Sequence, residues 1–174
     1  MLQLILMISL SFSACARSGY VRKHWAYPID ADKDCQNTRA EILIERSSRP
    51  VTFKNHKRCT VANGEWQDFY YSEIVSEASK IQIDHVVPLK NAYISGGANW
   101  SREQKRAFAN DPLNLVITSS KTNQQKGAKD LTQWLPIDHK LACRYSLRWI
   151  EIKTKYNLII TESERNAVKL QSCF

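Results

Sequence analysis

The residue types best suited to phosphate chemistry lie between residues 83 and 127. Asp84 and His85 are adjacent and close a short apolar run, and Asn114 and Asn123 follow them along the chain. Carboxylate and amide oxygens are ligands that hard divalent cations such as Mg²⁺ prefer, and a histidine can take up a proton near neutral pH. This set predicts a site in which one metal ion and one general base act on a phosphate.

Two strands and a helix are needed to bring these residues together. Residues 80–83 alternate in polarity and predict a strand that ends in Asp84-His85. Residues 114–118 predict a second strand, and residues 119–123 lead into a helix that ends or breaks at Gly127. Because successive side chains of a strand point to opposite faces, we expect a distortion or turn at Asp84-His85 if both are to face one site.

Further helices and short strands are expected around this unit. Residues 38–41 and 101–104 have the spacing of a capping box, with Thr38 as the cap of the first helix. Residues 51–53 and 59–61 predict short strands, with Asn63-Gly64 as a turn, and residues 131–136 predict a short helix. A longer helix is expected from Asp138 or His139 onward, because apolar residues then recur at three- and four-residue steps.

Length and charge limit the classes of protein to consider. A chain of 174 residues is long enough for one domain with a proper core. Its net charge is +8 and its pI is about 9.3, and a basic surface attracts polyanions. Basic charge is shared by many exported proteins, so it favours nucleic-acid binding only in combination with the site residues.

The first residues predict a secretory signal. Leu2 to Phe12 is almost wholly apolar and is too short to span a bilayer, which needs about 20 residues. The small residues Ala14-Cys15-Ala16 favour a signal peptide over residues 1–16 and a single mature domain from Arg17 to residue 174. Lipidation of Cys15 after a lipoprotein-type cleavage is the competing interpretation, and a buried N-terminal helix or strand is a third.

Four cysteines remain beyond Cys15, namely Cys35, Cys59, Cys143 and Cys173. An even number in an exported chain predicts two disulfides. Three pairings are open, and the local one would close two loops of moderate size. A zinc site is disfavoured because the sequence has no Cys-x-x-Cys pair.

Taken together, these residues resemble the HNH (His-Me finger, ββα-metal) endonucleases. The resemblance is strongest to an exported branch related to the C-terminal nuclease domain of GmrSD-type restriction enzymes. The resemblance covers roughly Cys35 to Tyr156. Its most specific residues are Ile83-Asp84-His85-Val86-Val87-Pro88-Leu89, Trp100, Phe108-Ala109-Asn110-Asp111, Asn114-Leu115 and Asn123-Gln124-Gln125-Lys126-Gly127. The third letter of H-N-H is replaced by Asn123, an oxygen ligand that favours Mg²⁺ or Mn²⁺ over zinc.

The resemblance implies an α+β fold with a small ββα-metal core, surrounded by helices and a short antiparallel sheet. It implies His85 as the general base and Asn114 as the residue that orients it. It assigns one Mg²⁺ (or Mn²⁺) ion to Asp84 and Asn123. Each of these residues has a plain structural interpretation when taken singly, and their order along the chain is what favours a nuclease.

The resemblance also implies contacts with substrate phosphate by Lys126 and Arg144, and cleavage that leaves a 5′-phosphate. We expect a monomer that acts on nucleic acid, on DNA in preference to RNA, with little sequence preference and no membrane span. Two other functions stay open. One is a non-catalytic envelope or surface protein that binds DNA or another polyanion, and the other is a surface lipoprotein that binds protein.

Overall fold

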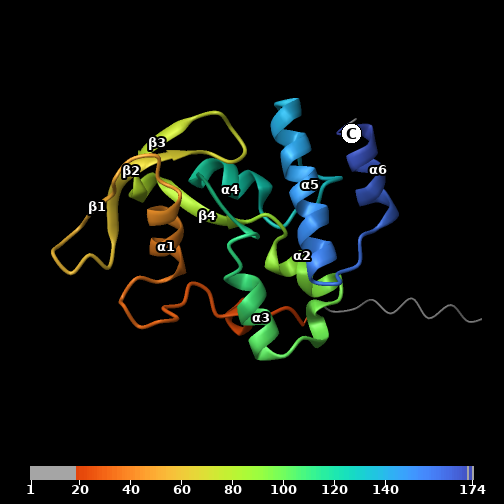
Figure 1. Ribbon diagram of the computed structural model, residues 1–174. Coiled ribbons are helices and arrows are strands. Elements are labelled where there is room, and N and C mark those ends of the chain that lie inside the picture. Colours follow the sequence, from red (N-terminus) through yellow and green to blue (C-terminus); the bar gives the residue numbers. More distant parts are fainter. Residues whose placement is uncertain (1–18, 172, 174) are drawn as a thin grey trace, which may run out of the picture.

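The computed structural model describes residues 19–171 and 173, so the predicted signal peptide and Cys15 lie outside the described residues. Helices and two small antiparallel sheets make up the described chain, which confirms the predicted α+β class. In Figure 1 one sheet and α1 lie at the left, α5 and α6 lie at the right, and the β4–α4 region lies between them.

The larger sheet has the order β1-β2-β3 and packs against the first helix. Its strands are β1 (Thr52–Phe53), β2 (Val61–Gln67) and β3 (Ile74–Glu77), and α1 covers Thr38–Glu45. Buried apolar side chains hold helix and sheet together, and the Trp66 indole donates a hydrogen bond of 2.7 Å to the Leu43 carbonyl. This module supports the second sheet, because Leu115 and Ile117 of that sheet belong to the same core cluster.

The second sheet is the predicted pair of strands, and the predicted helix follows it at once. β4 (Ile81–His85) pairs antiparallel with β5 (Leu115–Ser119), and α4 (Ser120–Lys126) begins directly after β5. Their ladder runs without a register shift to the pair His85–Leu115. The distortion expected at Asp84-His85 is therefore absent from this ladder.

The connection from β4 to β5 and the segment before α1 form a second layer. η1 (Arg22–Trp25) precedes α1, η2 (Ala78–Lys80) precedes β4, and α2 (Leu89–Ile94), η3 (Gly97–Asn99) and α3 (Arg102–Ala109) connect the strands. The Trp25 ring is buried, with ring centroids 5.7 Å from Phe108 and 5.9 Å from Trp100. Aromatic packing thus fixes η1 against α3.

Two C-terminal helices complete the core, α5 (His139–Lys155) and α6 (Glu162–Leu170). Asp138 caps α5, Thr161 caps α6 in a capping box, and Ser101 caps α3 in the predicted capping box. For α1 the prediction was wrong, because Asn37 and not Thr38 accepts the hydrogen bond from the Ala40 amide. Among the described helices, none combines the length and the apolar character needed to cross a bilayer.

Two local predictions are corrected. Asn63 and Gly64 lie inside β2 and form no turn. A side chain at Gly64 would place its Cβ 2.6 Å from the Trp66 ring and 2.7 Å from the Ser47 hydroxyl, so the glycine serves a close approach between neighbours. Residues 131–133 form a turn and residues 134–136 are irregular, in place of the expected short helix.

The cysteines form the local pairs. Cys35 bonds to Cys59 and Cys143 bonds to Cys173, which confirms two disulfides and settles the pairing left open by the sequence. The first bond ties the segment before α1 to the loop between β1 and β2, and the second ties the C-terminal end to α5.

Candidate active site

Three of the predicted site residues line one pocket of about 420 Å³. Asp84 and His85 come from the end of β4, and Asn123 comes from α4. Both members of the Asp84-His85 pair reach the pocket although the ladder is regular, since β4 ends at His85 and the chain turns away there. The β4–β5–α4 unit thus brings together residues that are far apart in the sequence.

Asp84 is buried, and one of its two carboxylate oxygens is bound by neighbouring side chains. Its Oδ2 accepts a hydrogen bond of 2.7 Å from the Tyr70 hydroxyl and lies 2.8 Å from the Lys126 ammonium. Its Oδ1 accepts no hydrogen bond from the described residues. One oxygen is therefore held by the protein, and the other is left for a ligand in the pocket.

Lys126 is fully buried and does not line the pocket. Its ammonium also donates a hydrogen bond of 2.8 Å to the His85 carbonyl. Burial lowers the pKa of Lys126, and the Asp84 carboxylate opposes that shift. The structure thus gives Lys126 an internal ion pair in place of the predicted contact with substrate phosphate.

His85 is buried, with its ring held in one orientation. Its Nε2 lies 2.8 Å from the Ala109 carbonyl oxygen. A carbonyl oxygen can only accept, so Nε2 carries the proton of the neutral ring and Nδ1 keeps the lone pair. Burial lowers the pKa of His85 to about 4, although the Ala109 hydrogen bond and the Asp84 charge both raise it. The imidazole is therefore neutral at pH 7.

Asn114 is also fully buried and holds the turn that follows His85. Its side-chain oxygen accepts a hydrogen bond of 2.8 Å from the Val87 amide, and its side-chain amide donates to the Val87 carbonyl at 3.3 Å. Its own carbonyl accepts a hydrogen bond of 2.8 Å from the Val86 amide. Asn114 thus acts on His85 through the backbone of the next two residues.

Asn123 is half-buried, and its side chain makes no hydrogen bond with the described residues. The pocket therefore offers a hard cation two oxygen donors, Asp84 Oδ1 and the Asn123 amide. Mg²⁺ is commonly held by one or two carboxylates, with water and phosphate completing its shell. The donor set fits Mg²⁺ or Mn²⁺, and within the described chain no cysteine lines this pocket to favour a softer metal.

Arg144 lies away from the pocket. Its guanidinium donates to the Phe69 carbonyl and stacks 4.3 Å from the centroid of the Phe69 ring. Its position therefore does not support the predicted role in binding substrate phosphate.

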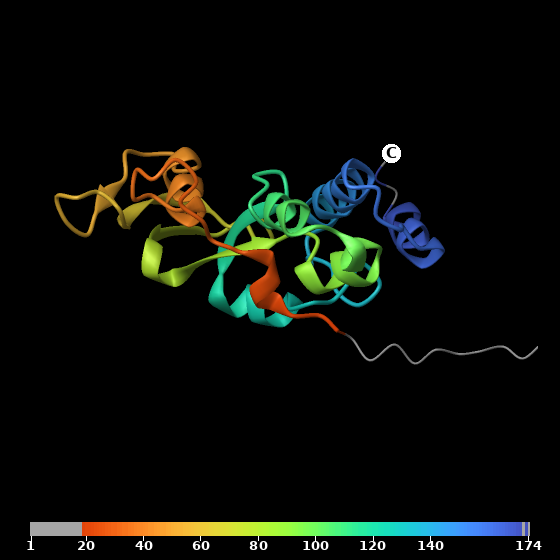
Figure 2. The same ribbon diagram turned by 90° about the horizontal axis from the view of Figure 1, so that it is seen from below.

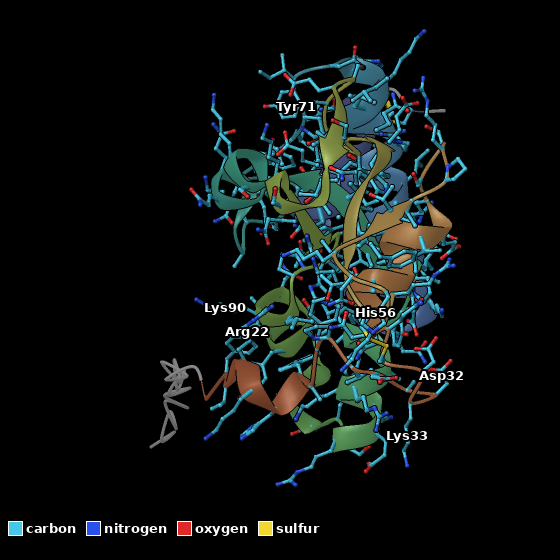
Figure 3. All side chains as sticks on the ribbon, turned by 90° about the vertical axis from the view of Figure 1, so that its left-hand side faces the viewer. Arg22, Asp32, Lys33, His56, Tyr71 and Lys90 are labelled. Atoms are coloured by element: carbon cyan, nitrogen blue, oxygen red, sulfur yellow. A yellow bond between two sulfur atoms is a disulfide. The ribbon has the colours of Figure 1, made fainter. Side chains whose placement is uncertain are left out.

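Three residues of the site were missed by the sequence reasoning. Tyr70 follows Phe69 and precedes Tyr71 in an aromatic run, and its contact with Asp84 had no sequence signal. Arg22 and Lys90 line the pocket from η1 and α2, and Figure 3 shows them together at one edge of the molecule. Lys90 follows the Asp84–Leu89 motif directly, so its position next to that motif could have drawn attention to it.

Comparisons with known proteins identify a family for this chain. The family described as "GmrSD restriction endonucleases, C-terminal domain" matches residues 35–168. An "Uncharacterized secreted protein" of Arthroderma benhamiae is 35% identical over 154 residues, which cover 87% of this chain and 74% of that protein. No solved structure matches the chain.

Proposed function

The chain belongs to the family of GmrSD restriction endonuclease C-terminal domains, and we propose that it is an exported, metal-dependent endonuclease that hydrolyses phosphodiester bonds of DNA. One observation carries the proposal. A neutral, buried histidine and two free oxygen donors meet in the same pocket, on the strand–strand–helix unit that the family match includes. That combination suits attack by water on a phosphate.

His85 acts as the general base. Its protonated Nε2 is held by Ala109, so Nδ1 can accept the proton of the attacking water. The water oxygen then bonds to phosphorus as the bond from phosphorus to the 3′ oxygen breaks, and the 3′ oxygen leaves with the bonding electrons and takes a proton from solvent. The product carries a 5′-phosphate. Asn114 keeps His85 in place by fixing the backbone that follows it.

Asp84 Oδ1 and Asn123 hold Mg²⁺ or Mn²⁺. When bound, such an ion offsets the charge that develops on the phosphate and on the leaving oxygen. Lys126 and Tyr70 act as positioning residues, because they occupy Asp84 Oδ2 and fix the direction of the other oxygen. A ligand held in this way loses little conformational freedom when the metal binds.

The substrate assignment rests on charge. A net charge of +8 raises the local concentration of any nucleic acid. Within residues 19–171, no element can be singled out as a reader of base edges, so little sequence preference is expected. DNA remains the expected substrate in preference to RNA.

Export is supported by three independent features. The apolar run from Leu2 to Phe12 has the form of a secretory signal, two disulfides suit an oxidising compartment, and the fungal relative is described as secreted. We propose a secreted or periplasmic location. Mass spectrometry of the mature N-terminus distinguishes cleavage after Ala16 from a lipid anchor at Cys15.

Cleavage assays with plasmid DNA and with single-stranded oligonucleotides test the function. The wild type is compared in Mg²⁺ and in EDTA with His85→Ala and with His56→Ala, which removes an exposed histidine from the β1–β2 loop. If His85 is the general base, metal-dependent cutting should fall at least about 10²-fold in His85→Ala. Cutting by His56→Ala should match the wild type. DNA binding without cutting in any divalent ion would favour the non-catalytic polyanion-binding protein. Cutting that survives in His85→Ala would place the site elsewhere.

A further inference from the structure

Two groups of basic residues differ in how the described fold uses their charged ends. In one group the charged end is used inside the fold: Arg39 and Arg46 donate to backbone carbonyls, and Lys126 and Lys153 form buried ion pairs. In the other group the side chains are exposed and make no ion pair or hydrogen bond with the described residues. Five members of the second group are Arg22, Lys23, Lys90, Arg102 and Arg106.

Two of these free cations stand at the active-site pocket. Arg22 comes from η1 and Lys90 from the first turn of α2, and both line the pocket that holds Asp84 and His85. Figure 2 shows η1 beside α2, and residues of α4 line the same pocket. An anion that enters the pocket therefore meets two unpaired cations.

The other three cations line a second pocket of about 550 Å³. Lys23 and His24 reach it from η1, and Arg102 and Arg106 reach it from α3. Glu103 is the single acidic residue in its lining. Because Arg22 and Lys23 are neighbours on η1, this short helix contributes to both pockets. The buried Trp25 ring holds η1 in place.

We propose that one strand of the nucleic-acid substrate runs from the active-site pocket across η1 into the second pocket. Arg22 and Lys90 bind the phosphates beside the scissile one. Lys23, Arg102 and Arg106 bind phosphates further along the same strand. The track supplies phosphate contacts, a role that the resemblance implied for Lys126 and Arg144, and it rests on the proposed nuclease function.

Three double variants, each losing two positive charges, test the track. Arg22→Gln with Lys90→Gln removes the charges at the active-site pocket, and Arg102→Gln with Arg106→Gln removes those at the second pocket. The matched control, Lys54→Gln with Lys57→Gln, removes exposed charges from the β1–β2 loop, which lies apart from η1 and α3 (Figure 1). Circular dichroism melts check that each variant is folded.

Affinity for single-stranded oligonucleotides of about 6 and about 18 nucleotides is measured by fluorescence anisotropy in EDTA, and KM for cleavage is measured in Mg²⁺. The Arg22→Gln, Lys90→Gln variant is expected to bind both oligonucleotides at least about tenfold more weakly. The Arg102→Gln, Arg106→Gln variant is expected to bind only the longer oligonucleotide more weakly. For this variant and the longer oligonucleotide, the magnitude of the slope of log affinity against log salt should decrease by about 1.4, or roughly 0.7 per lost phosphate contact.

The possible outcomes separate this inference from the proposed function. If all three variants have the same affinity and cleave as the wild type does, the track is overturned and the proposed nuclease function stands. A loss found only in the control variant would place the strand over the β1–β2 loop and would also overturn the track. The expected ordering of affinities without any cleavage would support the track and reject the enzyme. A wild type that neither binds nor cuts would reject both.

Discussion

The ammonium of Lys126 lies 2.8 Å from Oδ2 of Asp84, and both side chains are buried. The same ammonium holds the His85 carbonyl at 2.8 Å, so one cation touches both members of the Asp84-His85 pair. Burying a carboxylate in this way costs free energy unless a cation and hydrogen bonds compensate for the lost water. Lys126 and Tyr70 both occupy Oδ2, which leaves the other oxygen for the pocket.

Replacing Lys126 with Met should destabilise the fold. The change leaves the Asp84 carboxylate buried without its cation, a loss that typically costs about 3–5 kcal/mol. Lys121→Met on the same helix is exposed and should cost at most about 0.5 kcal/mol. Urea unfolding at pH 7 measures both. An unchanged unfolding free energy together with a raised KM would instead give Lys126 the phosphate contact first predicted for it.

Removing the amide of Asn123 should weaken metal binding without unfolding the protein. Asn123→Ala takes away one of two proposed ligands, and loss of even an outer-shell partner usually costs at least about tenfold in affinity. Isothermal titration with Mn²⁺ measures this without substrate. Gln125→Ala, exposed on the same helix, is the control and should bind as the wild type does. Equal affinity in Asn123→Ala would remove this residue from the metal site.

The strands, the helix and the shared pocket of the site could be predicted from the sequence, because each depends on local signals. Alternation marks β4, and Asp84, His85 and Asn123 keep the order that the family pattern requires. The burial of Lys126 could not be predicted, since a lysine on a polar helix reads as a solvated residue. Only the β4–β5 pairing brings its partner to it.

The remaining errors have similar causes. Asn63-Gly64 has the composition of a hairpin turn, but packing of Trp66 over the glycine outweighs that local preference. Arg22 lies before the region of family resemblance, and a lone exposed arginine carries no periodic signal. Its relation to the pocket depends on the packing of Trp25 against Phe108 of α3. These two residues are more than 80 positions apart in the sequence.

Removing the Cys35–Cys59 bond should lower stability and leave the active site intact. The bond joins residues 24 positions apart, and the loop-entropy model gives about 3–4 kcal/mol for such a loop. The double change to Ser should lower the urea midpoint, while cleavage at low temperature stays near the wild-type rate. The matched variant at Cys143 and Cys173, with a separation of 30, should lose a similar amount. An unchanged urea midpoint in both variants would mean that neither disulfide stabilises the fold by restricting the unfolded chain.

Asp111 should contribute a pH-dependent part of the stability. Burial alone would raise the pKa of Asp111, but hydrogen bonds from Lys155, the Leu113 amide and the Tyr156 hydroxyl outweigh it and hold the pKa below its usual value. The Lys155 ammonium lies 2.6 Å and the Tyr156 hydroxyl 2.8 Å from Oδ2.

A carboxyl whose pKa is lower in the folded state than in the unfolded state stabilises the fold above the unfolded pKa, near 4. That stability is lost as the pH falls through the folded pKa. Asp111→Asn should therefore cost about 1–3 kcal/mol at pH 7, the usual range for hydrogen bonds to a charged group. The difference from wild type should shrink as the pH drops below about 4. Thermal unfolding between pH 7 and pH 2 measures it, with Asp138→Asn at the exposed cap of α5 as a comparison that lacks the Lys155 ion pair. A difference that stays constant over this range would show that the ionised form of Asp111 is not what stabilises the fold.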